Sequence, residues 1–233
     1  MFTCSGEHVL TSGDAGVTCL SNDVTILRHQ LSPAQSVRLG APAGQADRAP
    51  LVPKLRAATT DEPVVVHLDF DGITAVNGSY LRATFLWLIR AGATAAAIEE
   101  GRLPAAPEGL EALHVFPVAT NMEAAVREEL SIALGDAQMS ALVADASEGD
   151  RIVKAVRVGH LDPALESTLS ALAKAKRASA TELCEAFPEK PAIKPPAWSN
   201  RLSELYRQRL ARREREGRQW FYVSLAEEVS RGR

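Results

Sequence analysis

Apolar positions in the first half of the chain fall into short continuous runs and into stripes at helical spacing. Residues 63–70 are almost continuously apolar over the length of one strand, which indicates a strand buried on both faces. Residues 24–31 and 113–118 are also predicted as strands. Residues 79–91 and 122–134 repeat apolar side chains with a helical period. This alternation of strands and helices predicts an α/β domain.

The segments around these elements carry turn and cap signals. Residues 40–53 are rich in Ala, Gly and Pro, so we expect a loop that leads into a short helix ending before Thr59. Asn121 is expected to cap the helix that follows it. Residues 141–158 are expected to form a hairpin or linker toward the C-terminal third of the chain.

The C-terminal third predicts three helices followed by a β-hairpin. Asp162 and Pro163 suit the cap and first turn of the first helix. Ser179 suits the cap of the second helix, and Glu182 stands at the third position of a capping box. A third helix is predicted over 197–210, with a leucine-rich face and a polar face. Two short strands around a glycine-containing tip then complete the pattern.

Composition restricts the class of protein. The chain has 233 residues, of which 46% are hydrophobic and 24% charged, as in an ordinary folded protein with a sizeable core. The longest apolar stretch, residues 83–98, is interrupted by Arg90 and Gly92 and is shorter than the roughly 18 residues that a membrane span needs. No secretory signal precedes it, so a cytoplasmic location without membrane contact is expected. The three cysteines lack zinc-site spacing: Cys4, Cys19 and Cys184.

The small net charge of −3 conceals two parts of opposite sign. Up to Asp150 the chain carries 9 basic and 19 acidic residues, whereas the remainder carries 17 basic and 10 acidic residues. A basic segment beside an acidic one is the charge distribution expected when one domain meets a polyanion and the other does not. The sequence therefore favours a nucleic-acid contact in the C-terminal third.

The resemblance of the C-terminal third is carried by SNRLSELYRQRLARREREGRQWFYVSL. This stretch resembles the recognition helix and wing of winged helix-turn-helix domains in small bacterial repressors of the MarR and ArsR type. The resemblance implies a helix in the DNA major groove and a wing on the DNA backbone. The residues that it assigns to DNA binding are Ser199, Asn200, Arg201, Ser203, Glu204, Arg207, Arg212, Arg213, Arg215 and Arg218.

The N-terminal part carries a second resemblance, in VVVHLDFDGITAVNGSYLRATFLWL. This stretch resembles STAS-like domains, which are related to anti-sigma-factor antagonists and place a serine before a helix for phosphorylation by a partner kinase. The corresponding position here is Gly78, with Ser79 beside it. The resemblance implies a module that binds a partner or senses a signal, without catalytic residues or a cofactor.

A rival interpretation of the same stretch is enzymatic. Asp69 to Thr74 has the Asp-x-Asp-Gly-x-Thr form of haloacid-dehalogenase-like phosphatases, which makes Asp69 a nucleophile and Asp71 an acid/base with Mg²⁺. Thr120 is then a second-motif hydroxyl. No later lysine and acidic pair at suitable spacing complete this set. His67, Asp69 and Asp71 share one strand face, but alternate polar residues at the end of a strand are more typical of a turn than of a metal site.

We therefore expect two domains and no enzyme. The predicted organisation is an N-terminal segment (1–35), a STAS-like α/β domain (36–136), a linker or hairpin (137–160) and a winged helix-turn-helix domain of three helices plus a β-hairpin (161–229). The predicted function is that of a transcriptional regulator that binds double-stranded DNA as a homodimer. An adaptor that docks a partner ATPase or kinase is the alternative. Catalytic residues, metal sites and cofactors are not expected.

Overall fold

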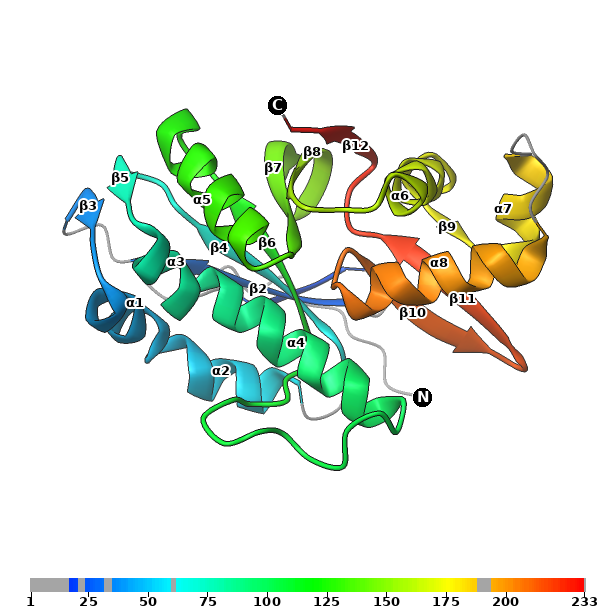
Figure 1. Ribbon diagram of the computed structural model, residues 1–233, viewed down its shortest axis with the longest axis horizontal. Helices are drawn as coiled ribbons and strands as arrows, with labels where there is room; N and C mark the ends of the chain where they lie inside the picture. Colours follow the sequence, from blue (N-terminus) through cyan, green and yellow to red (C-terminus); the bar gives the residue numbers. More distant parts are fainter. Residues whose placement is uncertain (1–16, 21–23, 32–34, 60–61, 188–193, 233) are drawn as a thin grey trace.

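The centre of the computed structural model is a seven-stranded, mostly parallel sheet (Figure 1). The structure describes residues 17–20, 24–31, 35–59, 62–187 and 194–232. Strands β2, β4, β6 and β7 run parallel in that order, β1 and β8 flank them antiparallel, and β12 pairs parallel with β8 at the edge. The strands across the sheet are β1 (Val17–Leu20), β2 (Val24–Gln30), β4 (Val64–Asp69), β6 (Val115–Thr120), β7 (Ser140–Glu148), β8 (Arg151–Gly159) and β12 (Glu228–Arg231).

The helices of the first 136 residues all cover one face of this sheet. The parallel strands advance in one direction across the sheet, and because crossovers between parallel strands are right-handed, every connecting helix lies on the same face. Leu55, Val66 and Leu86 belong to the apolar core on this side. Its elements are α1 (Ala41–Arg48), α2 (Leu51–Ala58), α3 (Gly78–Ala83), α4 (Phe85–Glu99) and α5 (Ala124–Asp136), with the small ladder of β3 (Val37–Arg38) and β5 (Ala75–Val76) beside them.

The opposite face of the sheet is covered by the C-terminal part of the chain. Val65, Phe116 and Leu142 alternate with the residues of the first face and pack against Leu169 and Leu205. The covering elements, here called the C-terminal unit, are α6 (Pro163–Ala175), β9 (Arg177–Ala178), α7 (Ala180–Ala186), α8 (Pro195–Arg207), β10 (Ala211–Glu216) and β11 (Gln219–Ser224). In Figure 1 they gather on the side of the molecule away from α1 to α3. The C-terminal unit and the sheet therefore share one core.

The predicted α/β alternation of the first half is confirmed, with corrections at its boundaries. The strands expected over 24–31, 63–70 and 113–118 are β2, β4 and β6. The segment expected as a loop over 40–53 instead contains α1, whose first turn accommodates Pro42. The expected helix over 79–91 is two helices, α3 and α4, and the second continues to Glu99.

The prediction that Asn121 caps the next helix is wrong. Asn121 has φ 52° and its side chain donates to Asp69, while the residue at the cap position of α5 is Glu123. The Asn121 side chain therefore links the carboxyl ends of β4 and β6 and does not cap α5.

The predicted signals of the C-terminal third are confirmed in detail. Asp162 accepts a hydrogen bond from the backbone N–H of Ala164, and Ser179 and Glu182 form the reciprocal capping box of α7. The bounds of the third helix differ from the expected 197–210, because α8 begins at Pro195 and ends at Arg207. Proline suits a first helical turn because its missing N–H would have no intrahelical partner there.

The segment expected as a linker or hairpin between domains, residues 137–160, is integral to the sheet. Its strands β7 and β8 are a hairpin in the large sheet, and β12 returns after the C-terminal unit to extend the same sheet. Of the expected N-terminal segment 1–35, β1 and β2 belong to the sheet, and residues 1–16 lie outside the described part of the chain.

One helical stretch in the described ranges, Gly78–Glu99, is long and apolar enough by composition to cross a membrane. In the fold 67% of its most apolar window is buried against the sheet and neighbouring helices, and the stretch is divided between α3 and α4 at Thr84. Protein atoms therefore cover most of this window, as they cover a core helix.

Candidate functional site

Helix α8 presents a polar surface at its beginning and an apolar face to the core. Trp198 and Leu202 are buried, and the helix packs against α6 and α7 on this side. Ser199 and Asn200 are exposed, and Arg201 is half-buried with its guanidinium carbon 5.9 Å from the Trp198 ring centroid. The first turns of α8 therefore offer hydrogen-bonding groups to solvent, as the sequence predicts.

The middle of α8 is tied into the C-terminal unit. Ser203 Oγ and the Tyr222 hydroxyl lie 2.9 Å apart, which links the helix to β11. Glu204 accepts hydrogen bonds from Arg207 at 3.3 Å and from Gln208 at 3.0 Å. Both predicted DNA-binding residues thus have intramolecular partners in this conformation.

Two of the predicted DNA-binding arginines bind carboxylates at the end of α4. Arg207 Nε donates to Glu100 Oε2 at 2.7 Å. Arg213 donates from Nη1 to Glu100 Oε1 at 3.0 Å and from Nη2 to Glu99 Oε1 at 2.9 Å. The Tyr206 hydroxyl also donates to Glu99. We call these five residues the acidic latch, since they fasten the end of α8 and β10 to α4.

The acidic latch is electrostatically matched. Burial raises the pKa of Glu99, but hydrogen bonds from Tyr206 and Arg213 outweigh it and hold the net pKa below its usual value. Burial also raises the pKa of Glu100, but the hydrogen bond from Arg207 and the other nearby arginines outweigh burial and lower the net pKa. Both carboxylates are therefore ionised at neutral pH, and Arg207 and Arg213 are engaged within the chain.

The remaining arginines that the sequence assigns to a wing divide between solvent and a cavity. Arg215 and Arg218 are exposed around the turn at Gly217, whose φ of 58° suits glycine. Arg212 alternates with Arg213 along β10 and lies on the other side, in the lining of a cavity of about 360 Å³ between the sheet and the C-terminal unit. The arginines that the resemblance assigns to the wing therefore lie in three different environments: the acidic latch, the cavity and the solvent-exposed turn.

The residues of the phosphatase-like pattern meet at the carboxyl ends of β4 and β6. Asp69 Oδ1 accepts from the Asn121 side chain at 2.8 Å and from the Asp71 backbone N–H at 3.0 Å. Thr120 follows in register beside Asp69. Asp69 is thus occupied as a turn-forming acceptor, and the described residues contain no group of three or more His, Cys, Asp or Glu arranged to hold a metal.

The sheet topology also leaves this edge without a crevice of the usual kind. Ligand crevices in open parallel sheets form where neighbouring crossovers diverge to opposite faces. Here β2, β4, β6 and β7 follow one another in order, and their helices share one face, so no such divergence occurs between them. The serine of the STAS-like pattern is engaged locally, since Ser79 Oγ donates to Asn77 Oδ1 at 3.0 Å at the start of α3.

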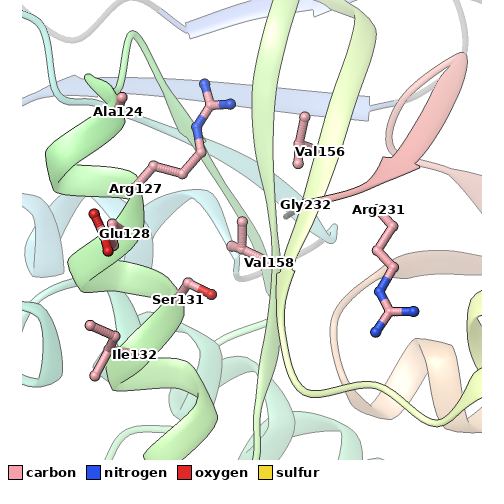
Figure 2. A pocket seen from close by; sticks show the side chains of 9 residues that line it. All are labelled: Ala124, Arg127, Glu128, Ser131, Ile132, Val156, Val158, Arg231 and Gly232. Carbon is pink, nitrogen blue, oxygen red and sulfur yellow. The ribbon is translucent and has the colours of Figure 1, made fainter.

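A second hollow lies on the helical face near the sheet edge (Figure 2). It has a volume of about 510 Å³ and is bounded by α5, β8 and β12. Figure 2 shows Arg127 of α5 on one side and Arg231 of β12 on the other, with Val156 and Val158 of β8 between them. Ile132 of α5, which also lines this hollow, is 54% exposed.

Sequence reasoning missed the partners of the predicted arginines. Glu99 and Glu100 end a helix 107 or more residues before the arginines that they bind, and no local pattern joins the two segments. Lys176, which lines the cavity beside Arg212, was missed as well. The overall charge contrast between the two parts of the chain is the signal that could have suggested their mutual contact.

Comparison with protein-family models, with curated proteins and with solved structures finds no significant match to this chain.

Proposed function

We propose that the chain is a transcriptional regulator that binds double-stranded DNA through its C-terminal unit. In this proposal residues 161–229 are a winged helix-turn-helix, and residues 36–136 are a STAS-like module that receives a signal or a partner. The observation that carries it is the element order helix, strand, helix, helix, strand, strand, with β9 paired to β11 and α8 exposing the polar side of its first turns.

The proposed DNA contact is smaller than the full set of sequence candidates. Ser199, Asn200 and Arg201 belong to the beginning of α8, and Arg215 and Arg218 flank the hairpin tip. In Figure 1 the tip and the beginning of α8 lie at the same end of the molecule along its long axis. Arginines at a hairpin tip suit phosphates, and short polar side chains at a helix start suit base edges.

A single unit of this size offers few phosphate contacts, so the proposal includes a homodimer. The open edge strand β12 and the exposed Ile132 beside the hollow of Figure 2 support a self-association surface on the sheet. Light scattering at increasing protein concentration tests this part, and Ile132→Glu is expected to shift the molecule toward the monomer.

The experiment for DNA binding is fluorescence anisotropy with random-sequence duplex DNA across a salt series. The intact protein is compared with Arg215→Ala/Arg218→Ala and with the matched control Arg82→Ala/Arg90→Ala, which removes the same charge from α3 and α4. If both tip arginines contact phosphates, the slope of log K against log salt falls by about 1.8 in the tip variant only. Equal slopes in all three proteins contradict the assigned surface.

A second candidate function is an adaptor, in which the C-terminal unit is a protein-interaction module for a partner ATPase or kinase. It is favoured by the acidic latch, where Arg207 and Arg213 already bind protein carboxylates. Absence of DNA binding at about 50 mM salt, where phosphate contacts are strong, supports the adaptor over the regulator.

A further inference from the structure

The cavity between the sheet and the C-terminal unit is lined by both apolar and cationic side chains. Its volume is about 360 Å³, at the lower end of the range of small-molecule sites. Val65 of β4 and Ile152 of β8 contribute apolar surface from the sheet, and Leu225 contributes it from the segment that follows β11. Such walls suit the body of a small organic molecule.

Arg212 supplies an unsatisfied positive charge to this cavity. It is half-buried on β10, and within the described ranges it makes no hydrogen bond or ion pair. Burial lowers its pKa, and the negative charge of Glu214, which is itself paired with Arg177, opposes this effect to a smaller extent. A poorly hydrated guanidinium without a carboxylate is a strong receptor for a carboxylate or phosphate group.

His67 adds a second polar group without a partner. Its side chain is 4% exposed, lies in the lining of the same cavity, and forms no hydrogen bond with the residues that the structure describes. Burial, aided by the positive charge of Arg28, lowers the pKa of His67 to about 4. A neutral imidazole can donate to or accept from a ligand without repelling Arg212.

The acidic residues of the lining are already neutralised. Asp150 pairs with Arg28 at 2.6 Å, and Glu227 pairs with Arg151 at 2.5 Å and with Lys176 at 3.7 Å. The cavity therefore keeps an excess of positive charge, centred on Arg212.

We propose that this cavity binds a small organic anion, with its carboxylate or phosphate paired to Arg212 and its apolar body against Val65, Ile152 and Leu225. The occupant bridges the sheet and the hairpin that carries Arg215 and Arg218, so it is a ligand that joins the two units. Binding of this anion does not depend on the proposed DNA contact.

Isothermal titration calorimetry of the intact protein tests the proposal with three probes: benzoate, phenyl phosphate and the neutral benzyl alcohol. The variants are Arg212→Gln, the charge-conserving Arg212→Lys, and Arg218→Gln as a matched control on the same hairpin. Circular dichroism melting of each variant verifies that it is folded before titration.

The expected result is saturable binding of at least one anionic probe with one site per chain, and much weaker binding of benzyl alcohol. Arg212→Gln is expected to weaken the anion by about thirtyfold, Arg212→Lys by less, and Arg218→Gln to leave it unchanged. The ratio of benzoate to phenyl phosphate affinity identifies the preferred head group.

The proposal is overturned if neither anion binds saturably to the intact protein up to about 10 mM, a range that includes weak fragment-like affinity. It is also overturned if folded Arg212→Gln binds the anions as well as the original protein, or if Arg218→Gln loses them equally. Loss of DNA binding without loss of probe binding leaves the cavity assignment intact and contradicts only the proposed function.

Discussion

Arg207, the last residue of α8, donates from Nε to Oε2 of Glu100, the residue directly after α4, at 2.7 Å. The two residues are 107 positions apart in the chain. Arg213 binds the same carboxylate, so the two arginines hold the end of α8 and the strand β10 against the end of α4. The C-terminal unit is thus fastened by charge as well as by its apolar face.

Removing the shared carboxylate is expected to destabilise the fold. Glu100→Gln leaves Arg213, whose side chain is 9% exposed, with a weaker partner, so the free energy of unfolding should fall by about 1–2 kcal/mol. Urea denaturation measures this change. Glu108→Gln makes the same substitution at an exposed loop position and is expected to stay within about 0.5 kcal/mol of the original. Equal stability of the two variants would refute the importance of the acidic latch.

The approach of α4 to β6 requires a glycine. A Cβ at Gly92 would lie 2.6 Å from the Val115 carbonyl oxygen and 3.1 Å from Arg209 Cδ, so Gly92→Ala forces backbone atoms apart. We expect a loss of about 1–3 kcal/mol in unfolding free energy. At Gly135, in α5, a Cβ would meet no atom within 4 Å, so Gly135→Ala should gain up to about 1 kcal/mol. Thermal and urea unfolding of the two variants test this, and a shift of the same sign in both contradicts the packing argument.

The buried imidazole of His67 makes stability depend on pH. Its pKa of about 4 in the fold lies below the usual 6.5 because of burial, so the unfolded chain binds a proton first as the pH falls. The contribution of neutral His67 to the free energy of unfolding is fully present above pH 6.5. It is lost as the pH falls from about 6.5 to 4, by about 3 kcal/mol in total.

The measurement is urea unfolding of the original protein and of His67→Gln at several pH values across this window. His29 and His114 have lowered pKa values from burial too, so the original protein and the variant share that part of the pH dependence. The difference in unfolding free energy between them is expected to shrink as the pH falls from 7 toward 4. A difference that stays constant over the window argues against a neutral His67 in the fold.

One side chain joins the start of α3 to the loop before α1. Asn77 Oδ1 accepts from the backbone N–H groups of Tyr80 and Gly40 and from Ser79 Oγ, each at 3.0 Å. Asn77→Ala removes this cap and should cost about 1–2 kcal/mol, whereas Asn77→Asp keeps the acceptor and adds a charge that suits a helix start. In urea unfolding, Asn77→Asp should therefore have a clearly higher free energy of unfolding than Asn77→Ala. Similar losses in both variants would show that the acceptor oxygen at this position is unimportant.

The sequence by itself determined the local structure. Mostly apolar runs specify β4 and β6 because a strand covered on both faces has no polar side. The capping signals at Asp162 and Ser179 act within a few residues of themselves. The hairpin of β10 and β11 follows from its glycine tip in the same way. These elements depend on neighbours in the chain, so a pattern of neighbours predicts them.

Only the tertiary structure decided how the two parts meet. Right-handed crossovers place every helix that connects the parallel strands on one face of the sheet. The apolar side chains of the opposite face pack against the C-terminal unit. That packing sends Arg213 to Glu99 and Glu100 and turns Arg212 into the cavity beside His67. The partners and the burial of each arginine depend on residues far away in the chain. Electrostatic interactions and burial act through space, so they leave no local pattern in the sequence.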